Sequence, residues 1–125
     1  MNKSEFIAVL EELRWPKDGY MILSGGSLLL RGLREETADM DISMTKRLAH
    51  EINLYDMPQD EEGFYQPREN MQVMDDFGKA DFDIVDGYQC ESLESVLAFK
   101  KRMMRPKDLK DIEKIEETLS LKTLK

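Results

Sequence analysis

The stretch that most limits the possible folds covers residues 25–43 and reads GGSLLLRGLREETADMDIS. Near its end, Asp39 and Asp41 alternate with the apolar residues Met40 and Ile42. Side chains at positions i and i+2 of a strand lie on the same face of the sheet. The alternation therefore predicts a strand that turns its apolar side to a core and projects both carboxylates from the other side.

These two carboxylates suit a divalent cation. They would lie about 7 Å apart along the strand, because each residue of a strand adds roughly 3.3 Å. Magnesium takes oxygen ligands and is typically held by one or two carboxylates together with substrate phosphates. The sequence thus predicts a Mg²⁺ site at Asp39 and Asp41. A calcium loop of the EF-hand kind is disfavoured, because Ile42 and Met44 suit a strand better than a ligand loop.

The residues just upstream suit a phosphate-binding turn. Gly25, Gly26 and Ser27 stand where a short apolar strand at residues 20–23 turns into a helix. Glycines let a phosphate approach the backbone, and the free N–H groups at a helix start attract the anion. The hydroxyl of Ser27 can add a hydrogen bond. We therefore expect these three residues to bind phosphate groups.

Helix and strand signals cover most of the remaining chain. The expected helices lie at residues 4–14, 45–53, 92–104 and from 106 onward, and the expected strands at 20–23, 38–44, 71–74, 82–85 and 88–90. Residues 54–70 hold two prolines and an acidic cluster, which predicts a surface loop or a short hairpin. Without an internal repeat or a linker, residues 1–125 are expected to form one α+β domain. It would be a small mixed β-sheet flanked by helices, with residues 92–125 as C-terminal helices packed on it.

Composition narrows the class of protein. The 41% apolar content fits a globular chain, and no apolar run approaches the roughly 18 residues that span a bilayer. The first residues lack the apolar core of a signal peptide. The single cysteine, Cys90, leaves no internal disulfide, and the single histidine, His50, leaves no Cys/His cluster for zinc. We expect a cytoplasmic protein without a membrane partner.

Charge is distributed unevenly along the chain, whose net charge is -8. Residues 51–95 carry thirteen acidic and two basic residues, whereas residues 96–125 carry nine basic and five acidic ones. Either these are ordinary solvated faces, or a basic patch on the C-terminal helices lies beside an acidic sheet edge. The acidity of the whole chain argues against non-specific nucleic-acid binding but leaves room for a local nucleotide site.

Together, the glycine turn and the aspartate strand resemble the nucleotidyltransferase superfamily related to DNA polymerase beta. The signature of that superfamily is G-[GS] at the start of a helix, followed by a strand with D-x-D. The form here looks most like small bacterial nucleotidyltransferases that include abortive-infection toxin enzymes, which show R-x-T-x-D-x-D. In this chain Arg34, Thr37, Asp39 and Asp41 read R-x-x-T-x-D-x-D, which is one residue longer.

A second stretch, AFKKRMMRPKDLKDIEKI, resembles another signature of the same group. In that signature a helix carries a lysine and is followed by R-x-K/R-D and an aspartate three residues later. The matching residues are Lys100, Arg105, Lys107, Asp108 and Asp111. The resemblance as a whole covers roughly residues 20–115.

The resemblance implies a nucleotidyltransferase-like fold and an activity. A Mg²⁺-dependent enzyme would transfer a nucleoside monophosphate from a nucleoside triphosphate to an acceptor, which would be RNA, a protein or a small molecule. Asp39 and Asp41 would hold the metal ion, and Lys100 would neutralise charge on the leaving group. The residues implied to bind the nucleotide are Gly25, Gly26, Ser27, Arg34, Lys100 and Asp108.

The family also implies a third catalytic carboxylate, for which the sequence offers several candidates. If the strand at residues 71–74 is the one concerned, Gln72 takes the acidic position, and Asp75 or Asp76 would have to substitute. If the next strand is concerned, Asp83 fits well between two apolar residues, and it is the favoured candidate. Without a third carboxylate, the chain would be a catalytically inactive relative that binds a nucleotide or a partner.

The acceptor is not encoded in any motif. A chain of 125 residues has little room for a separate acceptor-binding domain. A homodimer, a partner protein or the loop at residues 54–70 would then contribute to acceptor binding.

Overall fold

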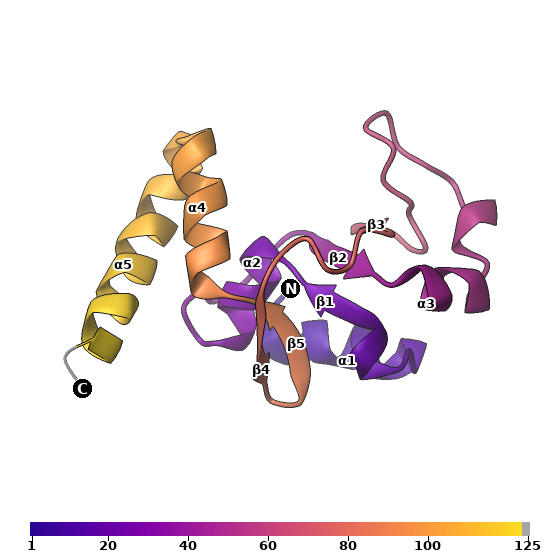
Figure 1. Cartoon of the computed structure of the whole chain (residues 1–125), viewed down its shortest axis with the longest axis horizontal. Helices are drawn as coiled ribbons and strands as arrows, with labels where there is room; N and C mark the ends of the chain where they lie inside the picture. Colours follow the sequence, from indigo (N-terminus) through magenta and orange to yellow (C-terminus); the bar gives the residue numbers. More distant parts are fainter. Residues whose placement is uncertain (124–125) are drawn as a thin grey trace.

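The computed structural model describes residues 1–123, which form five α-helices and a five-stranded mixed sheet (Figure 1). The helices are α1 (Lys3–Leu13), α2 (Ser24–Leu30), α3 (Lys46–Glu51), α4 (Leu93–Met103) and α5 (Leu109–Thr123). The strands are β1 (Tyr20–Ile22), β2 (Met40–Met44), β3 (Met71–Met74), β4 (Phe82–Val85) and β5 (Tyr88–Glu91). The predicted α+β class is confirmed. No helix in the described part of the chain is both long and apolar enough to cross a membrane.

The order of the strands decides which residues can meet. Across the sheet they run β3-β2-β1-β5-β4. Strand β2 pairs in parallel with β3 and antiparallel with β1, while β5 pairs in parallel with β1 and antiparallel with β4. The aspartate strand β2 is therefore separated from β4 by two other strands. Its register with β3 sets Asp41 directly beside Gln72.

Strand β2 has the two-sided character that its alternation predicts. Met40, Ile42 and Met44 are at most 1% exposed and belong to the main core. Asp41 lies on the opposite side and is half-buried. Apolar residues of α1, such as Phe6, complete the same core. One side of the strand is therefore packed in the core, and the other carries the polar side chain of Asp41.

The hairpin of α4 and α5 packs at one end of the sheet, against α2 (Figure 1). Leu28 of α2 joins Leu93, Val96 and Ile115 in a second, smaller core, whereas the next residue, Leu29, belongs to the main core. Helix α2 thus connects the sheet to the helical hairpin.

The segment between α3 and β3 is a loop with local order. Its residues 57–70, called the acidic loop below, include isolated antiparallel bridges from Tyr65 to Gln59 and to Val73. The carboxylate of Asp60 accepts hydrogen bonds from backbone N–H groups within the loop, at 2.9 and 3.0 Å. These contacts give the loop a defined shape beside β3.

Cys90 lies on β5, an inner strand of the sheet, in register with Ile22 of β1. Its side chain is completely buried in the main core. Burial raises the pKa of its thiol to about 12, because the thiolate would lose its hydration there. Cys90 is a packing residue of the sheet.

Candidate functional site

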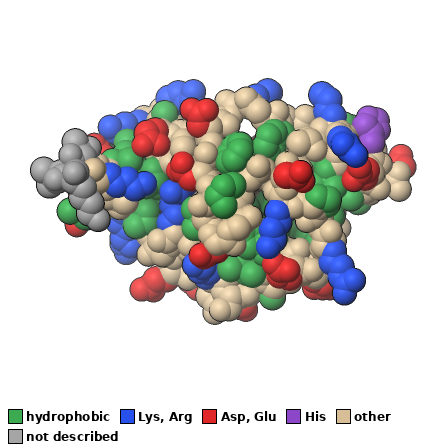
Figure 2. Space-filling model, turned by 60° about the horizontal axis from the view of Figure 1, so that its bottom comes forward, with side chains coloured by type: hydrophobic (Ala, Val, Ile, Leu, Met, Phe, Trp, Pro, Cys, Tyr) green, Lys and Arg blue, Asp and Glu red, His purple; other side chains and the backbone are tan. Residues whose placement is uncertain are grey.

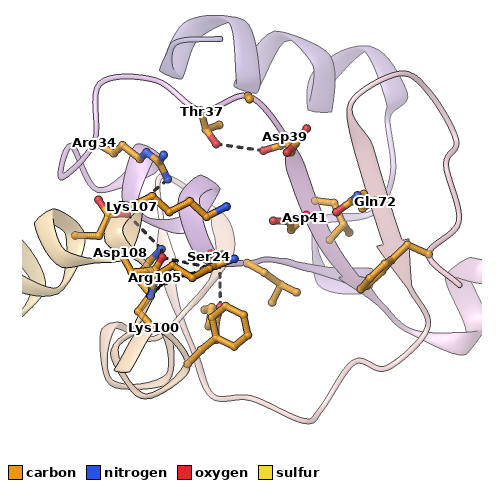
Figure 3. A pocket seen from close by; sticks show the side chains of 18 of the residues that line it. Ser24, Arg34, Thr37, Asp39, Asp41, Gln72, Lys100, Arg105, Lys107 and Asp108 are labelled. Atoms are coloured by element: carbon orange, nitrogen blue, oxygen red, sulfur yellow. Dashed lines mark hydrogen bonds and ion pairs between the residues drawn. The ribbon is translucent and has the colours of Figure 1, made fainter. Parts of the chain in front are cut away.

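A cavity of about 550 Å³ opens between the polar side of β2 and β3, the start of α2, the turn between α4 and α5, and the acidic loop. It collects charged side chains from parts of the chain that are distant in sequence (Figure 3). Six of these charged residues are Asp39, Asp41, Lys100, Lys107, Asp108 and Asp111. The two stretches singled out in the sequence therefore meet at one place.

Asp39 and Asp41 both line this cavity, as the alternation predicts. Asp39 directly precedes β2 and is exposed, whereas Asp41 is half-buried within the strand. Burial raises the pKa of the Asp41 carboxyl, and the negative charges of Asp39 and Glu91 raise it further. A carboxylate in such surroundings is stabilised by any cation that comes near it.

The donor set fits a magnesium ion that is only partly held by protein. Within residues 1–123 no three His, Cys, Asp or Glu side chains converge in the manner of a complete metal cage. Magnesium usually keeps several waters and uses one or two carboxylates plus substrate phosphates. Asp39 and Asp41, on a cavity open to solvent, match that requirement.

The glycine turn is divided between the cavity and the core. Gly25 lines the cavity, but Gly26 and Ser27 do not. A methyl group on Gly26 would lie 2.7 Å from both Phe6 and Ile22, so this glycine permits close packing. Ser27 is fully buried, and its hydroxyl donates to the carbonyl of the last β5 residue at 2.7 Å. The predicted roles of Gly26 and Ser27 as phosphate ligands do not fit these positions.

Ser24, and not Ser27, is the serine of this turn that lines the cavity. It lines the cavity beside Gly25 and has a φ of 50°, in the left-handed region. Its backbone N–H donates to Oε1 of Glu91 at 2.9 Å, while Oε2 accepts from the Ser95 hydroxyl at 2.6 Å. Glu91 is 9% exposed and also lines the cavity. Because it lies 67 residues from Ser24, no local pattern in the sequence indicates this contact.

Lys100 is buried between two carboxylates. Its Nζ lies 3.2 Å from Asp108 and 3.3 Å from Asp111, and its side chain is 4% exposed. Arg105 donates to Asp108 from Nε at 2.7 Å and from Nη2 at 3.1 Å. The hydrogen bond from Arg105 is the main reason that the pKa of Asp108 falls to about 2. The structure thus brings together Lys100 and Asp108, which the sequence predicts to belong to one site. The positive charge of Lys100 is balanced by the carboxylates of Asp108 and Asp111.

Two other cations face the open part of the cavity. Arg34 lies 3.7 Å from Asp111, and its guanidinium stands so near Gly25 that a Cβ there would be 2.7 Å from Nη1. Lys107 is exposed and points toward Asp39 and Asp41 (Figure 3). Within the described residues Lys107 forms no ion pair, so its charge is available to an anion.

Asp83, the favoured third carboxylate, does not reach the cavity. It lies on β4, at the edge of the sheet opposite to β3, and its carboxylate accepts a hydrogen bond from Arg31 at 3.1 Å. Two strands, β1 and β5, separate it from β2. The residue pattern within a single strand does not indicate this separation. The preference for Asp83 is therefore corrected by the strand order.

The other candidates lie nearer. Asp75 accepts hydrogen bonds from Tyr55 at 2.6 Å and Lys46 at 3.4 Å and is not part of the cavity wall. Asp76 does line the cavity and accepts from the hydroxyl of Ser43 at 2.6 Å. Gln72 occupies the position beside Asp41, so the side chain next to Asp41 on β3 is an amide and not a carboxylate.

No family model, curated protein or solved structure matches this chain. Its function has to be inferred from the chemistry of the cavity.

Proposed function

We propose that this protein is a Mg²⁺-dependent nucleotidyltransferase that moves a nucleoside monophosphate from a nucleoside triphosphate to an acceptor hydroxyl. One observation carries the proposal: the carboxylates of Asp39 and Asp41 face the cations Arg34 and Lys107 across a single cavity. Carboxylates suit a metal ion, and guanidinium and ammonium groups suit phosphate oxygens. A triphosphate with its metal ion is the ligand that satisfies both sides. The same motifs carry the resemblance to nucleotidyltransferases.

Charged residues of the cavity would have distinct roles in this reaction. Bound Mg²⁺ would be held by Asp39 and Asp41 and would supply neutralisation of the phosphate charge. Arg34 presents a planar fork to phosphate oxygens, and Lys107 presents a point charge. The acceptor hydroxyl would give its proton to water in the open cavity or to the carboxylate of Asp76, which lines it. As the acceptor oxygen bonds to the α-phosphorus, the bond from the α-phosphorus to the bridging oxygen breaks and pyrophosphate leaves. Lys107 would stabilise the negative charge that develops on this leaving group.

The buried ion pairs around Lys100 position this apparatus. Lys100 connects α4 to Asp108, in the turn before α5, and to Asp111 in the first turn of α5. Lys107 lies in the same turn as Asp108. Asp111 also holds Arg34 at 3.7 Å. Lys100, which the sequence predicts to bind phosphate directly, would instead hold in place the two cations that face the open cavity, Arg34 and Lys107.

A second candidate function is nucleotide binding without transfer. Gln72 favours it, because an amide beside Asp41 can neither act as a base nor add charge to a metal site. Binding to a partner protein in the nucleotide-bound state would then be the biological role. The two candidates differ in whether a labelled α-phosphate ever becomes attached to an acceptor.

The experiment compares Asp41→Asn with Asp83→Asn. Titration calorimetry of the wild type with nucleoside triphosphates should show binding that requires Mg²⁺. Asp41→Asn should lose that dependence and should lose transfer on the order of 10²-fold or more. Asp83→Asn removes the same charge outside the cavity and should change neither property.

Two results would contradict the proposal. One is a wild type that binds no triphosphate in the presence of Mg²⁺, and the other is an Asp41→Asn variant that retains transfer. Mg²⁺-dependent binding without a product, tested with triphosphates labelled at the α-phosphate and with RNA and protein acceptors, would favour the second candidate.

A further inference from the structure

Two surfaces of opposite charge rise on either side of the cavity. One is the acidic loop, residues 57–70. The other, called the basic tip below, consists of residues 101–110, where α4 ends and α5 begins. Both project to the same side of the sheet, the tip at the upper left and the loop at the upper right of Figure 1. Both also contribute residues to the cavity wall, namely Glu62 from the loop and Lys107 from the tip.

The basic tip combines uncompensated charge with exposed apolar side chains. Arg102 and Lys110 are exposed and form no ion pair within the described chain. Met103, Met104 and Leu109 are 48%, 56% and 53% exposed. The one acidic residue of the tip is buried and already paired. Contact with an acidic, partly apolar surface would lower the free energy of such a surface.

The acidic loop has the complementary properties. Glu61, Glu62 and Glu69 are exposed, and the loop's single basic residue, Arg68, is directed to Glu12 of α1 at 3.6 Å. Beside the loop, Tyr55 is 40% exposed and supplies apolar surface. On the face of Figure 2, by contrast, acidic and basic side chains are mixed. Segregated charge thus flanks the cavity.

We infer that the basic tip binds the acidic loop of a second copy of this chain in a two-fold symmetric dimer. The tip and the loop rise from the sheet in the same direction (Figure 1), and each contributes residues to the cavity wall. A two-fold axis that passes over the cavity therefore sets each tip against the partner's loop, and the contact is made twice. Symmetric dimers of this kind bury the same surface on both copies. The two cavities then face each other, and each opening is bordered by the partner copy.

The inference does not depend on the activity proposed above. It rests on surface charge and shape, and a dimer would form whether or not the cavity binds a nucleotide. Its test likewise uses residues outside the cavity wall.

The test is a charge exchange followed by light scattering after size exclusion. The wild type should have twice the chain mass of 14.6 kDa. A tip variant, Arg102→Glu with Lys110→Glu, and a loop variant, Glu61→Lys with Glu69→Lys, should each be monomeric because like charges then meet. An equimolar mixture of the two variants should form a dimer again. In that mixed dimer both contacts join opposite charges.

The control variant, Lys79→Glu with Lys122→Glu, makes the same change in net charge away from the tip and should remain dimeric. Circular dichroism establishes that each variant is folded. A wild type that stays monomeric up to its solubility limit would overturn the inference, as would a mixture that remains monomeric. A monomer whose tip binds a single-stranded RNA oligonucleotide or poly-glutamate would overturn it too and would assign the tip to that partner.

Discussion

At the scale of single residues, Asp41 lies where function and stability are opposed. Its carboxylate is partly buried beside two other negative charges, which raise its pKa above the ordinary value of 3.8. Because the folded state raises this pKa, the ionised form is disfavoured on folding. This effect lowers the free energy of unfolding by its full amount at pH values above the raised pKa. The loss disappears as the pH falls toward 3.8, because the carboxyl is then protonated in both states.

Asp41→Asn should therefore increase the free energy of unfolding at neutral pH. The gain should shrink as the pH is lowered through the pKa of Asp41, since both side chains are then uncharged. Chemical denaturation at a series of pH values measures the difference. Adding Mg²⁺ should stabilise the wild type and leave the variant unchanged, because a ligand stabilises only the state that binds it. Equal stability of both proteins at pH 7 without Mg²⁺ would contradict this account.

The sequence predicted individual residues well where their signal is local. Asp39 and Asp41 are separated by one residue, and a strand's period of two is enough to assign them to one side. The burial of Ser27 could not be predicted, because a glycine pair marks a turn without showing which neighbouring side chain faces the cavity. Glu91 was missed because its partner Ser24 is 67 residues away.

At the scale of elements, α2 owes its position to two adjacent glycines that act differently. A methyl group on Gly26 would press against the rings and branches of Phe6 and Ile22 in the core. A methyl group on Gly25 would meet the end of Arg34 at 2.7 Å and the hydroxyl of Thr37 at 3.1 Å. The first contact is with packed core atoms, and the nearest atom in the second belongs to a long side chain that can move.

Gly26→Ala should lower the free energy of unfolding by about 1–3 kcal/mol, because overpacking a filled core forces its neighbours apart. Gly25→Ala should change stability by less than about 1 kcal/mol, since alanine favours the helix. It should weaken triphosphate binding instead, by displacing Arg34. Urea titration and calorimetry on the pair of variants separate the two effects, and a larger stability loss for Gly25→Ala would refute the assignment.

Most elements could be predicted from periodicity, including β3 and β4 with the observed bounds. Their order in the sheet could not, because strand pairing is decided by contacts between distant segments. That order is what excludes Asp83 and brings Gln72 to Asp41. Whether β3 or β4 lies beside the aspartate strand β2 thus depends on the topology of the sheet. A local sequence pattern carries no information about that topology.

At the scale of the whole molecule, α2 makes the sheet and the α4–α5 hairpin dependent on each other. Leu28 packs in the core shared with the hairpin, and Leu29 packs in the core of the sheet. If either the hairpin or the sheet came away from α2, an apolar face of this helix would be exposed to water. The buried Lys100 further ties the hairpin to itself through Asp108 and Asp111. Removing one partner from such a pair costs more than the pair contributes.

The chain should consequently unfold in one step. Trp15 packs edge-on against Tyr20 at 5.9 Å between ring centroids and reports on the sheet side, while far-ultraviolet circular dichroism reports on the helices. The two signals should have the same urea midpoint, as expected for a two-state domain. If the helical signal fell first while the Trp15 fluorescence stayed native, the hairpin would be a separate unit.

The burial of Cys90 has a practical consequence for labelling. A thiol reagent needs access and a thiolate, and this side chain, completely buried and with a pKa of about 12, offers neither in the folded protein. A cysteine introduced at the exposed Lys79, outside the tip and the loop, would therefore be the single site at which a fluorescent dye attaches. Donor and acceptor dyes at that site would report whether and how fast two copies exchange partners, with the native cysteine left in place.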